Sequence, residues 1–511
     1  MVYKVYSGRV GGIFADLITA EVDASSGLPG LDMIGLLGSE VREAKDRVRV
    51  SLRNNGINIP AMKITVNLSP ADERKAGAAF DLPIAVALLG VFGHIESFNP
   101  EETLIIGELS LDGEIRPVRG ILPIVRMARE KGFKYVLLPR QNLTEGLLIH
   151  GIKMVPVESL SSVMGILSSY ENIENYVVAE CKTPLDASSN EDEADFNDVV
   201  GQEGAKRAAL ICAAGFHHFL MTGPPGTGKS LIAKRISSIM PRLSYEESLE
   251  VTTIYSVAGK LPGGNSFISK RPFISPHHGT SSNALVGGGI NVMPGLISLS
   301  HKGILFLDEL AEFKRQTLDY LRQPLEDGEI TVSRAKGSVK YPADFMLVAA
   351  MNPCPCGYFP DRNKCSCTQA SISRYLSKVS GPIMDRIDVC VEIGRMDPSE
   401  IENRSSESLG SDEMRCMVER AVGVQKKRYE KENFRFNSQI PASKIGEYIK
   451  LSKECNDFAM SLYTKMQLSM RSYYKILRVA RTIADIDGDE DVQVRHVAEA
   501  SCYRFPDYLG G

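Results

Sequence analysis

One stretch of eight residues has the types and spacing of a phosphate-binding loop. It fits the pattern G-x-x-x-x-G-K-[ST], with an apolar run at 219–221 before it and a helix-forming run at 231–236 after it. Its glycines let backbone N–H groups turn toward phosphate oxygens, its lysine reaches the β- and γ-phosphates, and its serine ligates Mg²⁺. The residues expected to bind nucleotide are, in order, Gly223, Pro224, Pro225, Gly226, Thr227, Gly228, Lys229 and Ser230.

Polar residues follow two later apolar runs. Their types indicate that the chain hydrolyses a nucleotide as well as binding it. Asp308 and Glu309 directly follow the apolar run 304–307. This pattern is typical of a buried parallel strand that has acidic residues at its carboxyl end. We expect Asp308 to hold Mg²⁺ and Glu309 to polarise the attacking water. Asn352 follows the run 345–350 and is expected to bond to the γ-phosphate or the water. The alternatives are an ordinary strand with an exposed acidic end and, for Asn352, a turn residue.

Four cysteines stand close together directly after Asn352. Two C-x-C pairs eight residues apart suit a tetrahedral Zn²⁺ site, although C-x-C is tighter than the usual C-x₂-C spacing. The alternative is a group of reduced free thiols. The candidate ligands are Cys354, Cys356, Cys365 and Cys367.

Composition places the chain among globular proteins of the cytosol. It has 511 residues, of which 43% are hydrophobic, and a formal net charge of −4, so any nucleic-acid contact must come from local basic surfaces. We find neither a basic segment followed by an apolar stretch at the N-terminus nor an apolar run near twenty residues, and therefore expect no membrane partner. The six remaining cysteines are scattered, which does not favour a disulfide framework.

The elements that must position these residues divide the chain into four parts. Residues 1–170 read as a mixed α/β domain, 171–194 as an acidic linker, 195–397 as a P-loop α/β core with a parallel sheet, and 398–511 as a helical lid. A helix at 39–54 carries five basic residues, and a solvated face is favoured over a DNA-facing surface. The Gly-, Pro- and Ser-rich region 256–300 interrupts the core. Its adjacent histidines, His277 and His278, are expected on a pore-facing insert rather than on a metal.

Two segments of the first domain resemble the proteolytic domain of Lon proteases. They are the run 75–87 and the run 107–121. Lon-type proteolysis uses a serine nucleophile and a lysine base, and these positions fall here on Ala79 and Leu122. Because neither side chain can do that chemistry, the resemblance implies a peptidase-like fold used for assembly or partner binding, and disfavours an ATP-dependent protease.

Later segments resemble AAA+ ATPases. The opening of the core at 195–202 is similar to the segment that closes over adenine, which places Val200 at the nucleotide. Arg386 stands where AAA+ proteins commonly carry an arginine that reaches the γ-phosphate of the neighbouring subunit, although an intrachain salt bridge with Asp385 or Asp388 is the alternative. Arg471, at the start of a lid helix, is the candidate nucleotide sensor.

Nearly the whole chain resembles the magnesium chelatase-like AAA+ ATPases of the YifB/ComM family, which carry a Lon-like N-terminal domain. The resemblance implies a ring, expected to be a hexamer, with ATP bound between subunits and a role in branch migration during uptake and recombination of DNA. A hairpin expected at 329–343 would then place Arg334 and Lys336 in a positive collar on DNA phosphates. The alternative is a chelatase-like ATPase that remodels a protein partner.

Overall fold

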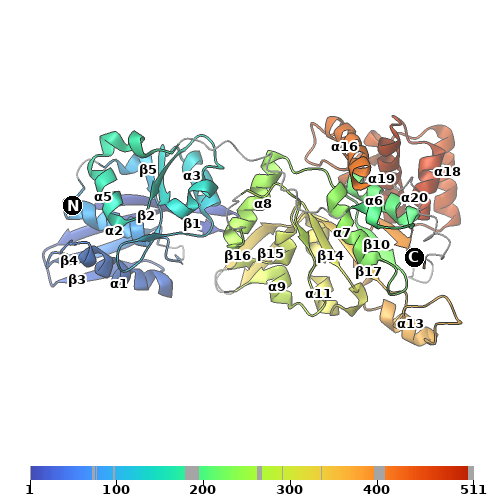
Figure 1. Ribbon diagram of the computed structural model, residues 1–511, viewed down its shortest axis with the longest axis horizontal. Helices are drawn as coiled ribbons and strands as arrows, with labels where there is room; N and C mark the ends of the chain where they lie inside the picture. The colour runs from blue at the N-terminus through green and yellow to red at the C-terminus, as the bar shows by residue number, and fades with distance from the viewer. Residues whose placement is uncertain are drawn as a thin grey trace.

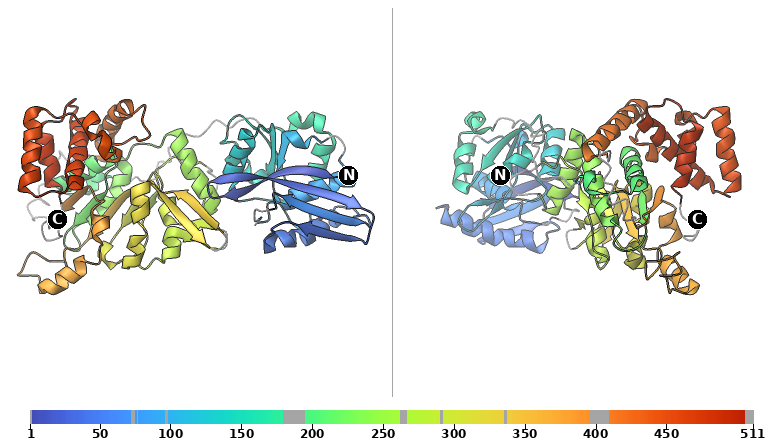
Figure 2. Two further views of the ribbon diagram at one scale, coloured as in Figure 1. Left: turned by 180° about the vertical axis from the view of Figure 1, so that it is seen from behind. Right: turned by 45° about the vertical axis from the view of Figure 1, so that its right-hand side comes forward.

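The computed structural model describes residues 2–71, 75, 77–95, 98–178, 195–261, 267–289, 292–334, 337–395 and 409–504. The chain forms three regions in a row (Figures 1 and 2). The N-terminal domain, in blue and teal, and the helical lid, in orange and red, lie at opposite ends, and the core with its parallel sheet lies between them. In the described ranges, every helix is too short or too polar to cross a bilayer.

The N-terminal domain is built on a mixed seven-stranded sheet of order β3-β4-β2-β1-β5-β8-β9. Its strands are β1 (Tyr3–Gly11), β2 (Phe14–Ser25), β3 (Gly30–Ile34), β4 (Lys63–Ser69), β5 (Thr103–Ile105), β8 (Tyr135–Pro139) and β9 (Lys153–Val157). The short strands β6 (Glu108–Leu109) and β7 (Ile115–Arg116) pair separately. The helices are α1 (Ser39–Asn54), α2 (Asp81–Val91), α3 (Ile121–Glu130), α4 (Leu143–Gly146) and α5 (Leu160–Ser168).

The described part of this domain ends at Val178. A 3₁₀ segment, Tyr170–Tyr176, packs Tyr170 and Ile173 into the apolar core of the domain, and Val178 bridges to Met154 beside β9. Ordered structure therefore continues beyond the boundary expected at residue 170, because the apolar residues of the polar 170–178 stretch have a core to bury against. Residues 179–194 of the expected linker lie outside the described residues.

The core has a five-stranded, all-parallel sheet of order β11-β14-β17-β10-β18, as the sequence predicts. Its strands are β10 (Phe219–Thr222), β11 (Phe273–Ile274), β14 (Ile304–Leu307), β17 (Met346–Met351) and β18 (Val389–Glu392). The helices are α6 (Glu203–Gly215), α7 (Lys229–Ile239), α8 (Tyr245–Ala258), α9 (Ser282–Val286), α10 (Leu296–Leu299), α11 (Arg315–Asp319), α12 (Arg322–Asp327), α13 (Gln369–Leu376) and α14 (Gly381–Met384). Two antiparallel pairs are inserted: β12 (Gly287–Gly288) with β13 (Met293–Pro294), and β15 (Glu329–Arg334) with β16 (Gly337–Pro342).

The central strands β14, β17 and β10 are buried at every position because both faces of the sheet are covered. Successive side chains point to opposite faces, so Phe306 packs with α6, α7 and the lid, whereas Leu305 and Leu307 pack with the inserts. Truncating Phe306 to alanine is expected to cost about 3 to 5 kcal/mol. The uninterrupted runs that identified these strands in the sequence are the direct result of this two-sided burial.

The lid consists of α16 (Ser411–Arg428), α17 (Ile445–Tyr448), α18 (Lys453–Lys465), α19 (Met470–Asp487) and α20 (Val494–Cys502). Its helices share one hydrophobic core with α6 and α7. On the other side of the core, α8 contacts the N-terminal domain: the Tyr245 hydroxyl donates to the Leu148 carbonyl over 2.6 Å, and the Ser256 hydroxyl donates to the Glu145 carboxylate. The first domain is thus held against the core by specific contacts to α8.

Candidate functional site

The phosphate-binding loop connects β10 to α7, as its motif predicts. Gly226 and Gly228 have φ of 78° and 89°, in the left-handed region where a side chain would add strain. At Gly223, a Cβ atom would lie 2.2 Å from the Ile393 carbonyl oxygen, so only glycine fits beside the end of β18. The loop delivers its backbone N–H groups to the N-terminus of α7, whose dipole favours anions. This cradle fits a polyphosphate.

Lys229, the first residue of α7, points its ammonium back into the loop. Its Nζ donates to the carbonyl oxygens of Gly223 and Pro224, each over 2.7 Å, and to Asn352 Oδ1 over 3.3 Å. Burial lowers the pKa of Lys229, and the charge of Asp308 opposes that shift. A desolvated ammonium held only by neutral oxygens is a strong electrostatic partner for phosphate.

Ser230 and Asp308 meet beside the lysine. The Ser230 hydroxyl donates to Asp308 Oδ2 over 2.6 Å, which joins the start of α7 to the end of β14. Hydroxyl and carboxylate oxygens are ligands that Mg²⁺ prefers, and one or two protein oxygens plus phosphates suffice for it. The donor set therefore fits Mg²⁺, which Ser230 and Asp308 would hold.

Glu309 adopts a left-handed backbone conformation, with φ of 53° and ψ of 48°. Its side chain is more than half exposed, and Glu309 Oε2 lies 3.2 Å from His278 Nδ1. The sequence did not identify His278 as part of this site, because the pairing of β11 with β14 is what brings it there. Among the described residues, neither His277 nor His278 belongs to a cluster of possible metal ligands.

The segment that contains Val200 lies near the same end of the sheet as the phosphate loop. Gln202 Nε2 donates to the Gly394 carbonyl over 2.9 Å, and Gly394 follows the end of β18, next to the Ile393 carbonyl that crowds Gly223. The segment expected to cover adenine therefore borders the loop. The structure brings together Lys229, Ser230, Asp308 and Asn352, with Glu309 and the Val200 segment at the rim.

Arg386 and Arg471 are not part of this group. Arg386 precedes β18, whereas the phosphate loop follows β10, and because these strands run parallel the two lie at opposite edges of the sheet. The Arg386 guanidinium pairs with Glu326, which corrects the expected intrachain alternative of Asp385 or Asp388. Asp388 instead accepts a hydrogen bond from the His218 backbone N–H over 3.0 Å.

Arg471 is exposed at the start of α19, on the side of the lid that faces this opposite edge. One turn later, Lys475 donates to the Ile387 carbonyl over 2.7 Å. Burial lowers the pKa of Lys475 to about 8, with Arg471 adding to the shift and Asp388 opposing it. A cationic face of the lid therefore lies beside the strand starts.

The predicted hairpin forms as β15–β16, with Glu329 opposite Pro342 and Arg334 opposite Gly337. Lys336 and the side chain of Arg334 lie outside the described residues. Tyr341, on the hairpin, donates to the Val292 carbonyl over 2.5 Å and so ties the hairpin to the preceding insert.

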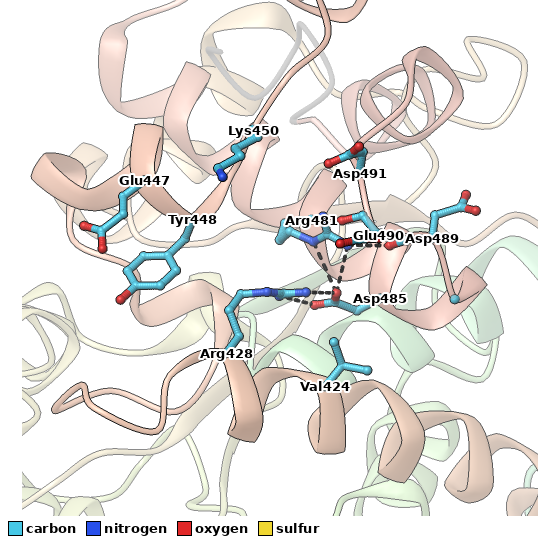
Figure 3. A pocket seen from close by; sticks show the side chains of 11 residues that line it. Val424, Arg428, Glu447, Tyr448, Lys450, Arg481, Asp485, Asp489, Glu490 and Asp491 are labelled. Atoms are coloured by element: carbon cyan, nitrogen blue, oxygen red, sulfur yellow. Dashed lines mark hydrogen bonds and ion pairs between the residues drawn. The ribbon is translucent and has the colours of Figure 1, made fainter.

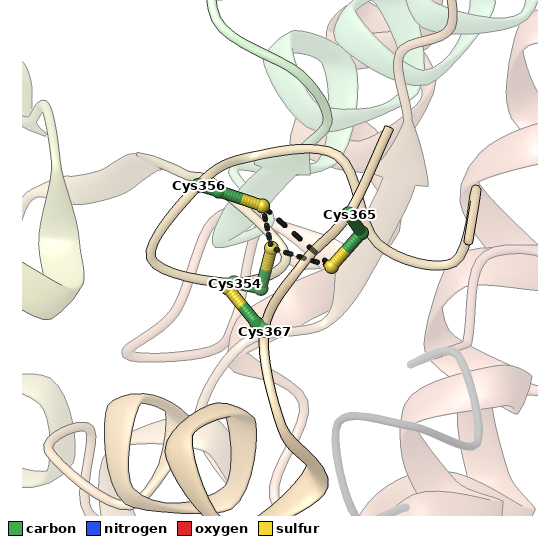
Figure 4. A group of neighbouring side chains, drawn as sticks. All are labelled: Cys354, Cys356, Cys365 and Cys367. Carbon is green, nitrogen blue, oxygen red and sulfur yellow. Dashed lines mark hydrogen bonds between the residues drawn. The ribbon is translucent and has the colours of Figure 1, made fainter. Parts of the chain in front are cut away.

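The four cysteines gather into one cluster after β17 (Figure 4). Their sulfur atoms all lie within 4.8 Å of one another. Although burial opposes it, hydrogen bonds from the Tyr358 backbone and neighbouring thiols lower the pKa of Cys356 to about 6. The loop also packs on the nucleotide site, since a Cβ at Gly357 would lie 2.6 Å from Pro225 Cδ. The donor set and its compactness fit a tetrahedral metal site.

Ala79 and Leu122, which stand at the positions of the Lon-type serine and lysine, pack in the same apolar cluster of the N-terminal domain. The fold brings the two positions into one cluster, and neither side chain can attack a carbonyl or take a proton. A serine–lysine dyad is therefore absent at these two described positions.

A cavity of about 520 Å³ lies in the lid, away from the phosphate loop (Figure 3). Its two arginines, Arg428 and Arg481, both point at Asp485, at distances of 2.6 and 2.9 Å. The Arg481 guanidinium also donates to the carbonyls of Asp489 and Glu490. Because both guanidinium groups already bind the Asp485 carboxylate, we interpret the network as a structural contact that holds α16 and α19 together.

The matches to known proteins cover nearly the whole chain. Residues 195–401 match the family described as magnesium chelatase, subunit ChlI; residues 20–142 match subunit ChlI of Mg-chelatase; and residues 408–504 match the C-terminal part of that subunit. The protein YifB of Escherichia coli is 40% identical over 505 residues, 99% of this chain and 97% of its own. The competence protein ComM of Haemophilus influenzae is 38% identical over 98% of this chain and 97% of its own. The magnesium-chelatase 38 kDa subunit of Rhodobacter capsulatus is 28% identical over 31% of this chain and 50% of its own.

Proposed function

The chain belongs to the YifB/ComM family of magnesium chelatase-like AAA+ ATPases, and we propose that it is a ring-shaped motor that hydrolyses ATP to move DNA strands. One observation carries the ATPase part of this proposal. The Ser230–Asp308 bond of 2.6 Å and the Lys229–Asn352 contact of 3.3 Å gather a magnesium ligand pair, a phosphate-binding cation and a γ-phosphate donor at one sheet edge. ATP is the ligand whose chemistry uses all of them.

The residues at this edge divide the work of hydrolysis. Ser230 and Asp308 would hold Mg²⁺, which supplies charge neutralisation at the phosphates when bound. Lys229 binds phosphate oxygens, Asn352 orients the terminal group, and Glu309 accepts a proton from the attacking water. Because these groups lie at the start of α7 and directly after β14 and β17, which the parallel sheet holds together, little reorganisation is needed when the substrate arrives.

We propose that the subunits form a ring, a hexamer, and that this assembly explains the position of the two arginines at the opposite end of the sheet. Arg386 and Arg471 face away from the Lys229 of their own chain, so we assign them to the nucleotide of a neighbouring subunit. Such an arginine can contribute roughly 10³ to 10⁵ in turnover. Arg386 must then exchange Glu326 for the γ-phosphate when the ring assembles.

DNA is the substrate that we propose for the motor, with branch migration or strand separation as its action. A relative that is 38% identical over nearly its full length is named a competence protein. With a net charge of −4, DNA contact must be local, and we assign it to Arg334 and Lys336 at the tip of the hairpin, which a ring would repeat around its axis. Because DNA is the proposed substrate, we propose that the protein acts in the cytoplasm.

A structural Zn²⁺ in the cysteine cluster is part of the proposal. Four sulfur atoms within 4.8 Å of one another would close a tetrahedral site and hold a loop that has only a small apolar core of its own. Because Gly357 packs on Pro225, the metal would also stabilise the phosphate loop.

A second candidate is an ATPase that remodels a protein partner. It is favoured by the match of residues 195–401 to a magnesium chelatase subunit. The likeness to the named chelatase subunit of Rhodobacter capsulatus extends over only 31% of the chain, however, whereas the likeness to ComM extends over 98%. We therefore place this candidate second.

Steady-state ATP hydrolysis with and without single-stranded, double-stranded and forked DNA tests the proposal, with Lys229→Ala as the blank. We expect stimulation by at least one DNA form, weakening as salt is raised, because phosphate contacts release counterions. Robust hydrolysis that no DNA form changes would support the protein-remodelling candidate instead.

A further inference from the structure

The phosphate loop is contacted on both sides by segments that follow the two strands beside β10. On one side, the Ile393 carbonyl, just after β18, occupies the space that a side chain at Gly223 would need. On the other side, Gly357 follows β17 and packs so closely that its Cβ atom, if present, would lie 2.6 Å from Pro225 Cδ. The sheet order β17-β10-β18 places one segment on each side of the loop. The first three residues of the loop therefore lie between these two segments.

The side chains that follow these two contacts bind each other. The Arg395 guanidinium lies over the Tyr358 ring, with 5.3 Å between Cζ and the ring centroid. Arg395 Nη2 also donates to the Tyr358 hydroxyl over 3.4 Å, a long hydrogen bond, so the cation–π contact is the main attraction. Tyr358 directly follows Gly357, and Arg395 comes two residues after Ile393. This pair, which we call the clasp, joins the two segments that flank residues 223–225.

The flanked part of the loop is the part that holds the ammonium of Lys229. Lys229 Nζ donates to the carbonyl oxygens of Gly223 and Pro224, each over 2.7 Å. The loop continues through Gly226 and Gly228, both in left-handed conformations, and glycine has more backbone freedom than any other residue. A loop with this freedom binds phosphate only while its N–H groups point at the ligand. Contacts that restrict the loop to that geometry therefore favour binding.

Both partners of the clasp are anchored outside the phosphate loop. Tyr358 belongs to the loop of the cysteine cluster (Figure 4), and its backbone N–H is hydrogen-bonded to Cys356. Arg395 follows Gly394, whose carbonyl accepts from Gln202 Nε2 over 2.9 Å. The clasp thus connects the cysteine loop to the segment that is expected to cover adenine.

We propose that Tyr358 and Arg395 are positioning residues that hold the phosphate loop in its nucleotide-binding conformation, a role that rests on the function proposed above. Neither side chain touches ATP in this role. A loop that is competent for only a fraction of the time binds with an apparent Kd raised by the reciprocal of that fraction. A cation–π contact at an exposed site supports a change of about 2- to 5-fold. The cysteine loop contributes to ATP affinity by this route.

A double-mutant cycle on the full-length protein tests the clasp, using Tyr358→Leu, Arg395→Met and the combined variant, with the Kd for ATP measured by calorimetry. Each single variant should raise the Kd by about 3-fold, and the combined variant should raise it no further, because either change alone breaks the contact. The KM for ATP should rise in parallel, while kcat at saturating ATP stays at the wild-type value. Tyr358→Phe keeps the aromatic ring and should bind ATP as the wild type does.

Arg362→Met provides the control within the same cysteine loop. Arg362 lies over the Phe359 ring at 4.9 Å, so this variant removes one charge and one cation–π contact and leaves both partners of the clasp in place. Its Kd should match that of the wild type. A thermal melt of each variant shows whether it is folded. If Tyr358→Leu unfolds, the comparison of Arg395→Met with Arg362→Met still decides, because each removes one positive charge.

Three outcomes would overturn the inference. Wild-type affinity in Tyr358→Leu would show that the contact does not position the loop. Additive losses in the combined variant would show that Arg395 acts on ATP through its charge and without Tyr358. Equal Kd values for Arg395→Met and Arg362→Met would show that Arg395 has no special role. Wild-type protein that fails to bind ATP is a different result, since it would refute the proposed function itself and the clasp with it.

Discussion

Replacing Lys229 with methionine separates the binding role of its charge from the stability of the fold. Methionine keeps most of the side-chain length and removes the ammonium. In the structure, that ammonium donates to two carbonyl oxygens at 2.7 Å and to Asn352 at 3.3 Å. A charge-assisted hydrogen bond to phosphate contributes about 1.5 to 3 kcal/mol, so its loss should weaken ATP binding by roughly 10- to 150-fold.

Although Lys229→Met should bind ATP more weakly, its folded state should be as stable as that of the wild type or more stable. Burial holds the pKa of Lys229 below its unfolded value, so at neutral pH the folded chain carries a charge that its surroundings disfavour. The expected Tm is equal to or higher than that of the wild type. Calorimetric ATP titration and a thermal melt measure the two quantities on the same preparation.

Lys234→Met is the matched control, because Lys234 is an exposed residue of the same helix, five residues further along α7. It should bind ATP as the wild type does. Equal ATP affinity in the two methionine variants would refute the assignment of Lys229 to the phosphates. A collapse of Tm in Lys229→Met alone would show that the lysine is a structural group.

Four further predictions follow from single contacts. Asp308→Asn should raise the Mg²⁺ concentration for half-maximal hydrolysis by about 10-fold or more, measured by Mg²⁺ titration, because it removes the charge that complements the ion. Asp485→Ala leaves the buried guanidinium group of Arg481 and the half-buried one of Arg428 without their shared carboxylate and should cost about 3 kcal/mol or more in a urea melt, with an unchanged melt contradicting a stabilising role of this network. Cys354→Ser should lower bound zinc, by metal analysis of untagged protein, from one equivalent to well below it; wild-type protein without zinc would refute the site. Burial raises the pKa of Glu145 to about 7, so stability should fall as pH rises from about 4.5 to 7, and Glu145→Gln should remove that slope in melts across this range.

Local patterns in the sequence were sufficient to predict the group of side chains that the fold gathers beside the loop of residues 223–230. The phosphate loop is defined by spacing alone, and the apolar runs before Asp308 and Asn352 identify buried parallel strands whose ends meet at one edge. The helical character of the lid was also predicted from the sequence. The long periodic pattern of α19, with Ile476, Leu477 and Ile483 on one face, reflects packing against the core.

Contacts between distant segments could not be predicted in the same way. The pairing of Arg386 with Glu326 and of His278 with Glu309 depends on which strands and helices become neighbours. No single-sequence pattern encodes that order. The docking of Tyr245 on Leu148 likewise joins two domains through a backbone carbonyl, which every residue possesses and which therefore leaves no signal in the sequence.

The most direct test of the proposed motor is ATP-dependent displacement of a labelled strand from a forked or branched DNA. Wild-type protein should release the strand with ATP and Mg²⁺ and not with a non-hydrolysable analogue, and Glu309→Gln, which retains the phosphate loop, should bind ATP and release none. Strand release by Glu309→Gln at the wild-type rate, or the absence of any release by a wild-type protein that hydrolyses ATP on the same DNA, would contradict the account.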